Sequence, residues 1–233
     1  RYSRMMTRIC LLAAVLLVAA APALAGVPKA ALRGAESSGC TTHTPGMDYT
    51  LLVQQWPATE SRNAEENYFT LHGNWPTFND GSYACDCGGS FDPSKISSIS
   101  DSMSRYWPSF RGSNDGFWSH EWEKHGTCAS TSPYLQGELN FFSNTLKARA
   151  NYDIYSALTK AGLQTGSSVR LSDVHSALVS AFGHDGSVGC TDGALDSVSL
   201  CLTPNLDVTD CPSNQSDDDC DSSIEWTAPA RRL

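Results

Sequence analysis

The sequence has little positive charge and lacks a long apolar run. Its 233 residues include 16 Lys and Arg against 25 Asp and Glu, which gives a formal net charge of −9 at pH 7. A protein that grips long RNA or DNA needs a basic face to displace counterions, so tight nucleic-acid binding at neutral pH is excluded. The apolar run 9–21 is shorter than the ~20 residues that span a bilayer, so a membrane anchor is not expected there.

Residues 1–25 are instead predicted to be a secretory signal peptide. Arg8 precedes the apolar run, and Ala23-Leu24-Ala25 provides the small-x-small pattern that signal peptidase cleaves. Removing this segment would take away three arginines and no acidic residue, and the net charge would fall from −9 to −12. Residues 26–48 are small, polar and weakly patterned, so we expect a loose start to the mature chain.

The sequence also lacks the paired CxxC knuckles of structural zinc sites, and Cys85 and Cys87 are too close together for the common zinc spacing. Apart from Cys10 in the signal segment, eight cysteines remain, an even number that is typical of a disulfide framework in an exported protein. Eight cysteines allow about a hundred pairings, and spacing alone does not choose among them. We expect no metal. Asn214-Gln215-Ser216 is a sequon that predicts N-glycosylation of Asn214 in a surface loop.

No internal repeat and no Pro-, Gly- or Ser-rich linker divides the chain, so we expect one α+β domain from 49 to 233, with an antiparallel sheet packed against helices and stapled by disulfides. The predicted strands are 49–57, 70–76 and 198–202. The predicted helices are 92–108, 117–126, two helices within 140–161 that separate near Asn151, and 172–183 with Ser172 as the N-cap.

Residues 117–126 form the densest group of titratable and aromatic side chains. In a helix, Lys124 lies about 40°, Glu121 about 100° and His125 about 140° round from His120. Two imidazoles, an ammonium and a carboxylate would then share less than half of the circumference. The alternative is a solvated charged face, but the interleaved aromatic residues favour a partly buried reactive wall.

This string superficially matches the HExxH motif of zinc proteases. That motif needs its two histidines at i and i+4 to bind one zinc from one helix face, whereas His120 and His125 stand at i and i+5. A metalloprotease is therefore excluded.

A further histidine, His72, ends a predicted strand in the string His-Gly-Asn-Trp-Pro at 72–76. If the fold brings His72 near His125, the two can act as general acid and general base, because an ordinary imidazole has a pKa of about 6.5. Lys124 would stabilise the developing negative charge. Such a set suits cleavage of RNA, whose own 2′-OH is the nucleophile, so no serine or cysteine nucleophile is needed.

The HGxWP string at 72–76 and the HEWxKHGTC string at 120–128 resemble the two active-site segments of the ribonuclease T2 family. The VQQWP string at 53–57 and the NDGSY string at 79–83 resemble further segments of plant members. The resemblance covers roughly residues 49–226. It implies an endoribonuclease that cleaves single-stranded RNA through a 2′,3′-cyclic phosphate, without metal or cofactor.

The resemblance also implies catalytic roles. His125 would be the general base, His72 the general acid, and His120 would hold the phosphate. Glu121 and Lys124 would stabilise the pentacovalent transition state.

Base binding and disulfides are implied in the same way. Trp75 and Phe117 fall where the family stacks a base, and Gln55 where it contacts the second base, so weak base preference is expected because stacking tolerates any base. The implied disulfides are Cys87–Cys128, Cys190–Cys220 and Cys201–Cys211, which leaves Cys40 and Cys85 available to pair.

Three departures from the family pattern stand out. Residues 56–71 contain no cysteine, although plant members have a cluster there; Asn74 stands where the family has Leu; and Thr77 stands where an acid or amide helps to read the base. If Asn74 is buried without partners, it costs about 1–3 kcal/mol and loosens the site.

We therefore expect a monomer that acts on single-stranded RNA, with no DNA and no membrane partner in the mature form. Mild acidity suits it, because one histidine must start neutral and the other protonated, and because a protein of pI ≈ 5.0 repels RNA less as the pH falls. That points outside the cell or to an acidic organelle of the secretory route. A non-catalytic storage protein on the same fold is the alternative; a self-incompatibility ribonuclease would be basic.

Overall fold

The computed structural model describes residues 39–215 and 218–230. The predicted signal peptide and residues 26–38 lie outside the described residues. Within them, no helix has both the length and the apolar character that crossing a membrane requires.

A mostly antiparallel sheet runs through the molecule in the order β1-β4-β3-β2-β7-β9-β5, and β6 and β8 also pair with β7. Only the β1–β4 and β7–β9 pairings are parallel among the strands that the structure describes. The strands are β1 Cys40–Thr42, β2 Tyr49–Gln55, β3 Thr70–Thr77, β4 Tyr83–Ala84, β5 Ser167–Arg170, β6 Ser187–Thr191, β7 Ala194–Leu202, β8 Val208–Thr209 and β9 Ser223–Trp226.

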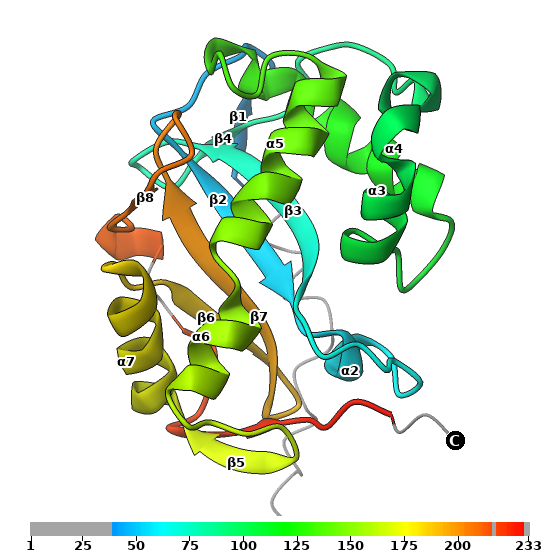
Figure 1. Ribbon diagram of the computed structural model, residues 1–233. Helices are drawn as coiled ribbons and strands as arrows, with labels where there is room; N and C mark the ends of the chain where they lie inside the picture. The colour runs from blue at the N-terminus through cyan, green and yellow to red at the C-terminus, as the bar shows by residue number, and fades with distance from the viewer. Residues whose placement is uncertain (1–38, 216–217, 231–233) are drawn as a thin grey trace, which may run out of the picture.

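Helices pack on this sheet and beside it. In Figure 1, α5 crosses in front of the central strands, α3 and α4 lie together beyond β3, and α7 lies on the other side of the molecule. The helices are α2 Pro57–Glu60, α3 Ser100–Tyr106, α4 Asn114–Lys124, α5 Glu138–Asn151, α6 Ile154–Lys160 and α7 Leu171–Phe182, with 3₁₀ turns η1 Pro93–Ile99, η2 Gly126–Thr131 and η3 Ser213–Gln215. The arrangement is a single α+β domain, as the sequence predicts.

The core lies between the central strands and α5. β2 is rich in strand formers and pairs on both edges, with β3 and with β7. Leu52 on β2 and Leu71 on β3 are fully buried in the same hydrophobic cluster as Phe141 and Phe142 of α5. This packing fixes β3 and thereby the place of His72.

The predicted elements form with shifted ends. The helix predicted at 117–126 begins earlier, at Asn114, because the Ser113 hydroxyl accepts a hydrogen bond from the Gly116 amide and caps it. It ends at Lys124, with His125 as the C-cap residue. Residues 92–108 form η1 followed by α3, and α7 begins at Leu171, so Ser172 is not its N-cap.

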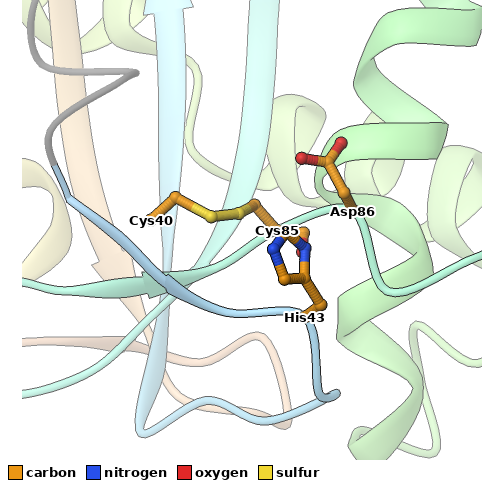
Figure 2. Close-up of side chains that lie close together, drawn as sticks. All are labelled: Cys40, His43, Cys85 and Asp86. Carbon is orange, nitrogen blue, oxygen red and sulfur yellow. A yellow bond between two sulfur atoms is a disulfide. The ribbon is translucent and has the colours of Figure 1, made fainter.

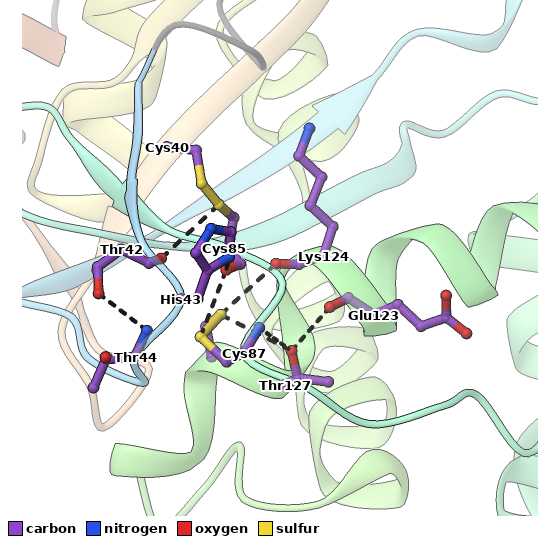
Figure 3. Close-up of a disulfide and its surroundings, with 10 residues drawn as sticks. Cys40, Thr42, His43, Thr44, Cys85, Cys87, Glu123, Lys124 and Thr127 are labelled. Carbon is purple, nitrogen blue, oxygen red and sulfur yellow. Dashed lines mark hydrogen bonds between the residues drawn. A yellow bond between two sulfur atoms is a disulfide. The ribbon is translucent and has the colours of Figure 1, made fainter.

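The expectation of a loose segment over 26–48 does not hold for residues 39–48. β1 pairs with β4, and the Gly46 amide donates to the Cys128 carbonyl at 3.2 Å. A disulfide joins Cys40 to Cys85, as Figure 3 shows. The small, polar composition concealed these contacts because all of them reach distant parts of the chain.

Four disulfides staple the part of the domain that the structure describes. Three are the pairs that the family resemblance implied, and the fourth joins the two cysteines left over. They are Cys40–Cys85, Cys87–Cys128, Cys190–Cys220 and Cys201–Cys211.

Candidate active site

β3 and α4 face each other and bring most of the predicted site residues into one cluster, which we call the β3–α4 wall. Its members are His72 and Trp75 from β3, Phe117, His120, Glu121 and Lys124 from α4, and His125 at the end of α4.

Aromatic contacts hold the imidazoles of this wall. The Trp75 ring lies 5.3 Å from that of His125 between centroids, with 27° between the planes, and 5.4 Å edge-on from that of His72. Phe117 packs 5.7 Å from His72 on another side. The ring centroids of His120 and His125 lie 6.2 Å apart. Both predicted proton-transfer residues therefore contact the same indole.

Burial separates the polar members of the wall. Glu121 is fully buried and His125 is 2% exposed, whereas His120 is exposed and His72 and Lys124 are half-buried. The indole Nε1–H of Trp75 donates to Glu121 Oε2 at 3.1 Å. The wall thus combines a buried carboxylate and imidazole with groups that an incoming anion can reach.

Two further tryptophans hold β3 against the segment that leads into α4. The Trp107 indole donates to the His72 carbonyl at 2.8 Å, and the Trp118 indole donates to the Trp107 carbonyl at 2.7 Å. Since Trp118 belongs to α4, this relay links the strand that carries His72 to the helix that carries the other polar groups.

Gln55 and Asn74 lie outside the wall's contacts. Gln55 is 5% exposed and its amide donates to the Leu71 carbonyl at 3.3 Å, so it is held within the sheet beside His72. Asn74 is fully buried and its amide donates to Thr145 Oγ1 of α5 at 3.2 Å. Its side chain therefore enters the core and neither faces solvent nor packs on the wall.

Tyr83 is a member of the site that the sequence reasoning missed. Its ring centroid lies 6.0 Å from that of His125 and 6.0 Å from Lys124 Nζ. The NDGSY string contained the signal, but only the pairing of β4 with β3 places this tyrosine beside His125.

Two clusters of described residues bring potential metal ligands within 4.8 Å of one another. The first, drawn in Figure 2, contains Cys40 and Cys85, whose sulfurs are joined in a disulfide, and His43, whose Nδ1 lies 3.1 Å from the Cys85 carbonyl oxygen. A disulfide offers no thiolate, so this cluster does not fit a metal centre.

The second cluster is His120, Glu121 and His125. Two imidazoles and a carboxylate are a donor set that a divalent transition metal accepts, although the spacing differs from HExxH. Of these three side chains, Glu121 and His125 are buried and His120 is exposed.

Comparisons with known proteins identify the family of this chain. The sequence model of the Ribonuclease T2 family matches residues 47–211. The chain is 34% identical over 197 residues to ribonuclease DdI of Dictyostelium discoideum, covering 80% of this chain and 87% of the relative. It is 32% identical over 203 residues to extracellular ribonuclease LE of Solanum lycopersicum, covering 77% and 86%.

A solved structure of RNase NT in complex with 5′-AMP superposes with a TM-score of 0.70 at 30% identity, covering 78% of this chain and 98% of that one. The chain belongs to the ribonuclease T2 family and is an endoribonuclease.

Proposed function

We propose that this endoribonuclease cleaves single-stranded RNA by transesterification through a 2′,3′-cyclic phosphate, with His125 as general base and His72 as general acid. The observation that supports this best is the contact of both imidazoles with Trp75, at 5.3 and 5.4 Å between ring centroids. One scissile phosphate can then meet both proton-transfer groups.

In the first step, His125 removes the proton of the 2′-OH and the 2′ oxygen attacks phosphorus. The bond from phosphorus to the 5′ oxygen breaks, and His72 donates a proton to that leaving oxygen. In the slower second step, water opens the cyclic phosphate with the two roles exchanged, which leaves a 3′-phosphate. The first nucleophile belongs to the RNA and the second is water activated by an imidazole, so no metal is proposed.

The remaining polar groups stabilise charge. His120 is exposed and holds a nonbridging phosphate oxygen, and Lys124 offsets the negative charge of the pentacovalent transition state. Glu121, buried beneath them, orients and balances this cationic set.

Bases are bound by stacking. We propose Trp75 and Phe117, together with Tyr83, as the aromatic surfaces for the base, which favours weak base preference. Gln55 is proposed to contact the second base; to do so its amide must leave the Leu71 carbonyl, to which it donates at 3.3 Å.

We also propose that residues 1–25 direct the chain into the secretory pathway and that Asn214 is glycosylated there. The four disulfides and a relative named as extracellular support this route. The mature protein is proposed to act as a monomer on RNA, not DNA, outside the cell or in an acidic compartment.

The test is cleavage of single-stranded RNA from pH 4 to 8 with EDTA present, comparing the parent with His125→Ala. A remote histidine variant, His184→Gln, serves as the matched control. We expect cyclic phosphate product, greatest at acidic pH, that is lost in His125→Ala and kept in the control. Inactivity of the well-folded parent would overturn the proposal and favour a storage or binding role.

A further inference from the structure

A buried hydrogen bond joins the two elements of the site. Glu121 is fully buried, and its Oε2 accepts from the indole Nε1–H of Trp75 at 3.1 Å. A hydrogen bond to a charged group in such surroundings is stronger than one between neutral groups, and it fixes the direction of the carboxylate.

The backbone at Gly73 makes room for this bond. A Cβ at Gly73 would overlap both Trp75 Nε1 and Glu121 Oε2, the two atoms that form it. Gly73 is not among the described glycines with positive φ, so space rather than backbone conformation requires glycine here.

Two imidazoles restrict how the indole could move away from such a Cβ. One face lies nearly parallel to the His125 imidazole at 5.3 Å, and His72 meets the ring edge-on at 5.4 Å. The protein occupies the face toward His125, so a base can stack on the opposite face only. Trp75 is therefore built into the wall as well as facing the substrate.

We propose that Gly73 and Trp75 are positioning residues for Glu121: the indole N–H holds the buried carboxylate in one orientation, and the absent side chain at Gly73 allows the approach. The inference rests on the proposed function of the site and extends it from base stacking by Trp75 to alignment of an acidic group. It also gives a physical reason for glycine in the string at 72–76.

The direct test removes the indole N–H of Trp75 and keeps the ring. Trp75 is replaced by β-(3-benzothienyl)alanine, which keeps the fused ring and its stacking surface but has sulfur in place of the N–H. On a dinucleoside phosphate substrate, we expect kcat to fall roughly tenfold and KM to stay within about twofold, since a hydrogen bond to a charged group is lost while stacking remains. The matched control is the same replacement at Trp122, which packs on Phe141 and leaves both constants unchanged.

A double-mutant cycle that combines the benzothienyl replacement with Glu121→Ala distinguishes positioning of the carboxylate from packing of the ring. If the indole acts through Glu121, the benzothienyl replacement has no further effect on kcat once the carboxylate is gone. Additive losses in the two variants would overturn the inference, as would an unchanged kcat in the single replacement.

Gly73→Ala provides the steric counterpart. We expect kcat to fall at least as far as in the benzothienyl variant, with every catalytic side chain still present. Should this variant fail to fold, the benzothienyl result alone decides. Failure of the proposed function is distinguishable, because it would appear as an inactive parent, whereas failure of this inference requires an active parent whose kcat does not depend on the Trp75 N–H.

Discussion

Histidines occupy two different kinds of surroundings in this molecule. In the β3–α4 wall they lie against aromatic rings: His72 against Trp75 and Phe117, and His125 against Trp75 and Tyr83. These ring contacts position the two imidazoles that we propose as the proton-transfer groups.

On the other side of the molecule, around α7, histidines face carboxylates. His175 Nδ1 lies 2.8 Å from Asp185 Oδ1, and its Nε2 lies 2.9 Å from Asp218 Oδ2. His184 Nδ1 lies 2.8 Å from Asp210 Oδ1. An imidazole can donate from both nitrogens only when it is protonated, so the two carboxylates at His175 favour its cation. The comparison separates the histidines that we propose to transfer protons from the histidines that bind carboxylates of distant segments.

Two groups outside the wall, His175 and Asp196, have raised pKa values. Burial opposes the charge of His175, but the hydrogen bonds and charges of Asp185 and Asp218 outweigh it and raise its pKa above the ordinary value. Burial, reinforced by Glu60 and Asp219, raises the pKa of Asp196 to about 7. Both groups bind protons more tightly in the folded state, so their stabilising contribution is present in acid and is lost as the pH rises.

The largest expected effect comes from removing a histidine of the β3–α4 wall. His72→Ala is expected to lower kcat by roughly 10²- to 10⁴-fold, because general acid catalysis of leaving-group departure is lost. His175→Gln at pH 5 should leave kcat within about twofold. Steady-state kinetics on a dinucleoside phosphate checks both, and a comparable loss in the two variants would show that the distinction between the groups is wrong.

Asp196→Asn should stabilise the protein at alkaline pH. The folded-state pKa of about 7 means that the wild type loses stability between the unfolded-state value of 3.8 and about 7, as a buried carboxyl ionises. The neutral amide removes that loss, so we expect the free energy of unfolding to rise by about 2 kcal/mol at pH 8 and to change little at pH 4. Urea unfolding at both pH values measures it; equal changes at the two would contradict the assignment.

His175→Gln should destabilise the protein, and the loss should appear in acid. The contribution of His175 is fully present below its unfolded-state pKa of 6.5 and is lost above its raised folded-state pKa. We expect a loss of about 1 kcal/mol at pH 5 and almost none at pH 9. His184→Gln is the control, with a smaller effect because Asp210 is 86% exposed and its ion pair is screened by solvent. Melting temperatures of both variants and the wild type from pH 5 to 9 measure these losses. A loss in His175→Gln that is the same at pH 5 and pH 9 would contradict the prediction.

Asn74→Leu should have the smallest effect on activity. The Asn74 amide donates to Thr145, but its Oδ1 is buried without a hydrogen-bond partner. Leucine removes that cost, so we expect stability to change by less than about 1 kcal/mol and kcat to stay the same, since the side chain enters the core rather than the wall. A large fall in kcat would contradict this prediction and show that the contact between Asn74 and Thr145 affects the geometry of the wall.

The sequence by itself determined the class of fold, the order of most elements and the α4 part of the site. His120, Glu121, Lys124 and His125 are neighbours in sequence, and helical periodicity alone places them on one side of α4. The end of α7 at Gly183 was also predictable, because the left-handed backbone of this C-cap strongly favours glycine.

Tertiary structure alone decided which distant residues meet. The pairing of β4 with β3 brings Tyr83 to His125, and the packing of β3 against α4 brings the Trp75 indole onto Glu121 over Gly73. The bridge from His175 to Asp218 likewise joins segments with no shared periodicity. Periodicity reports on neighbours within one element, whereas contacts between elements depend on strand register, helix packing and disulfide closure, which local pattern does not encode.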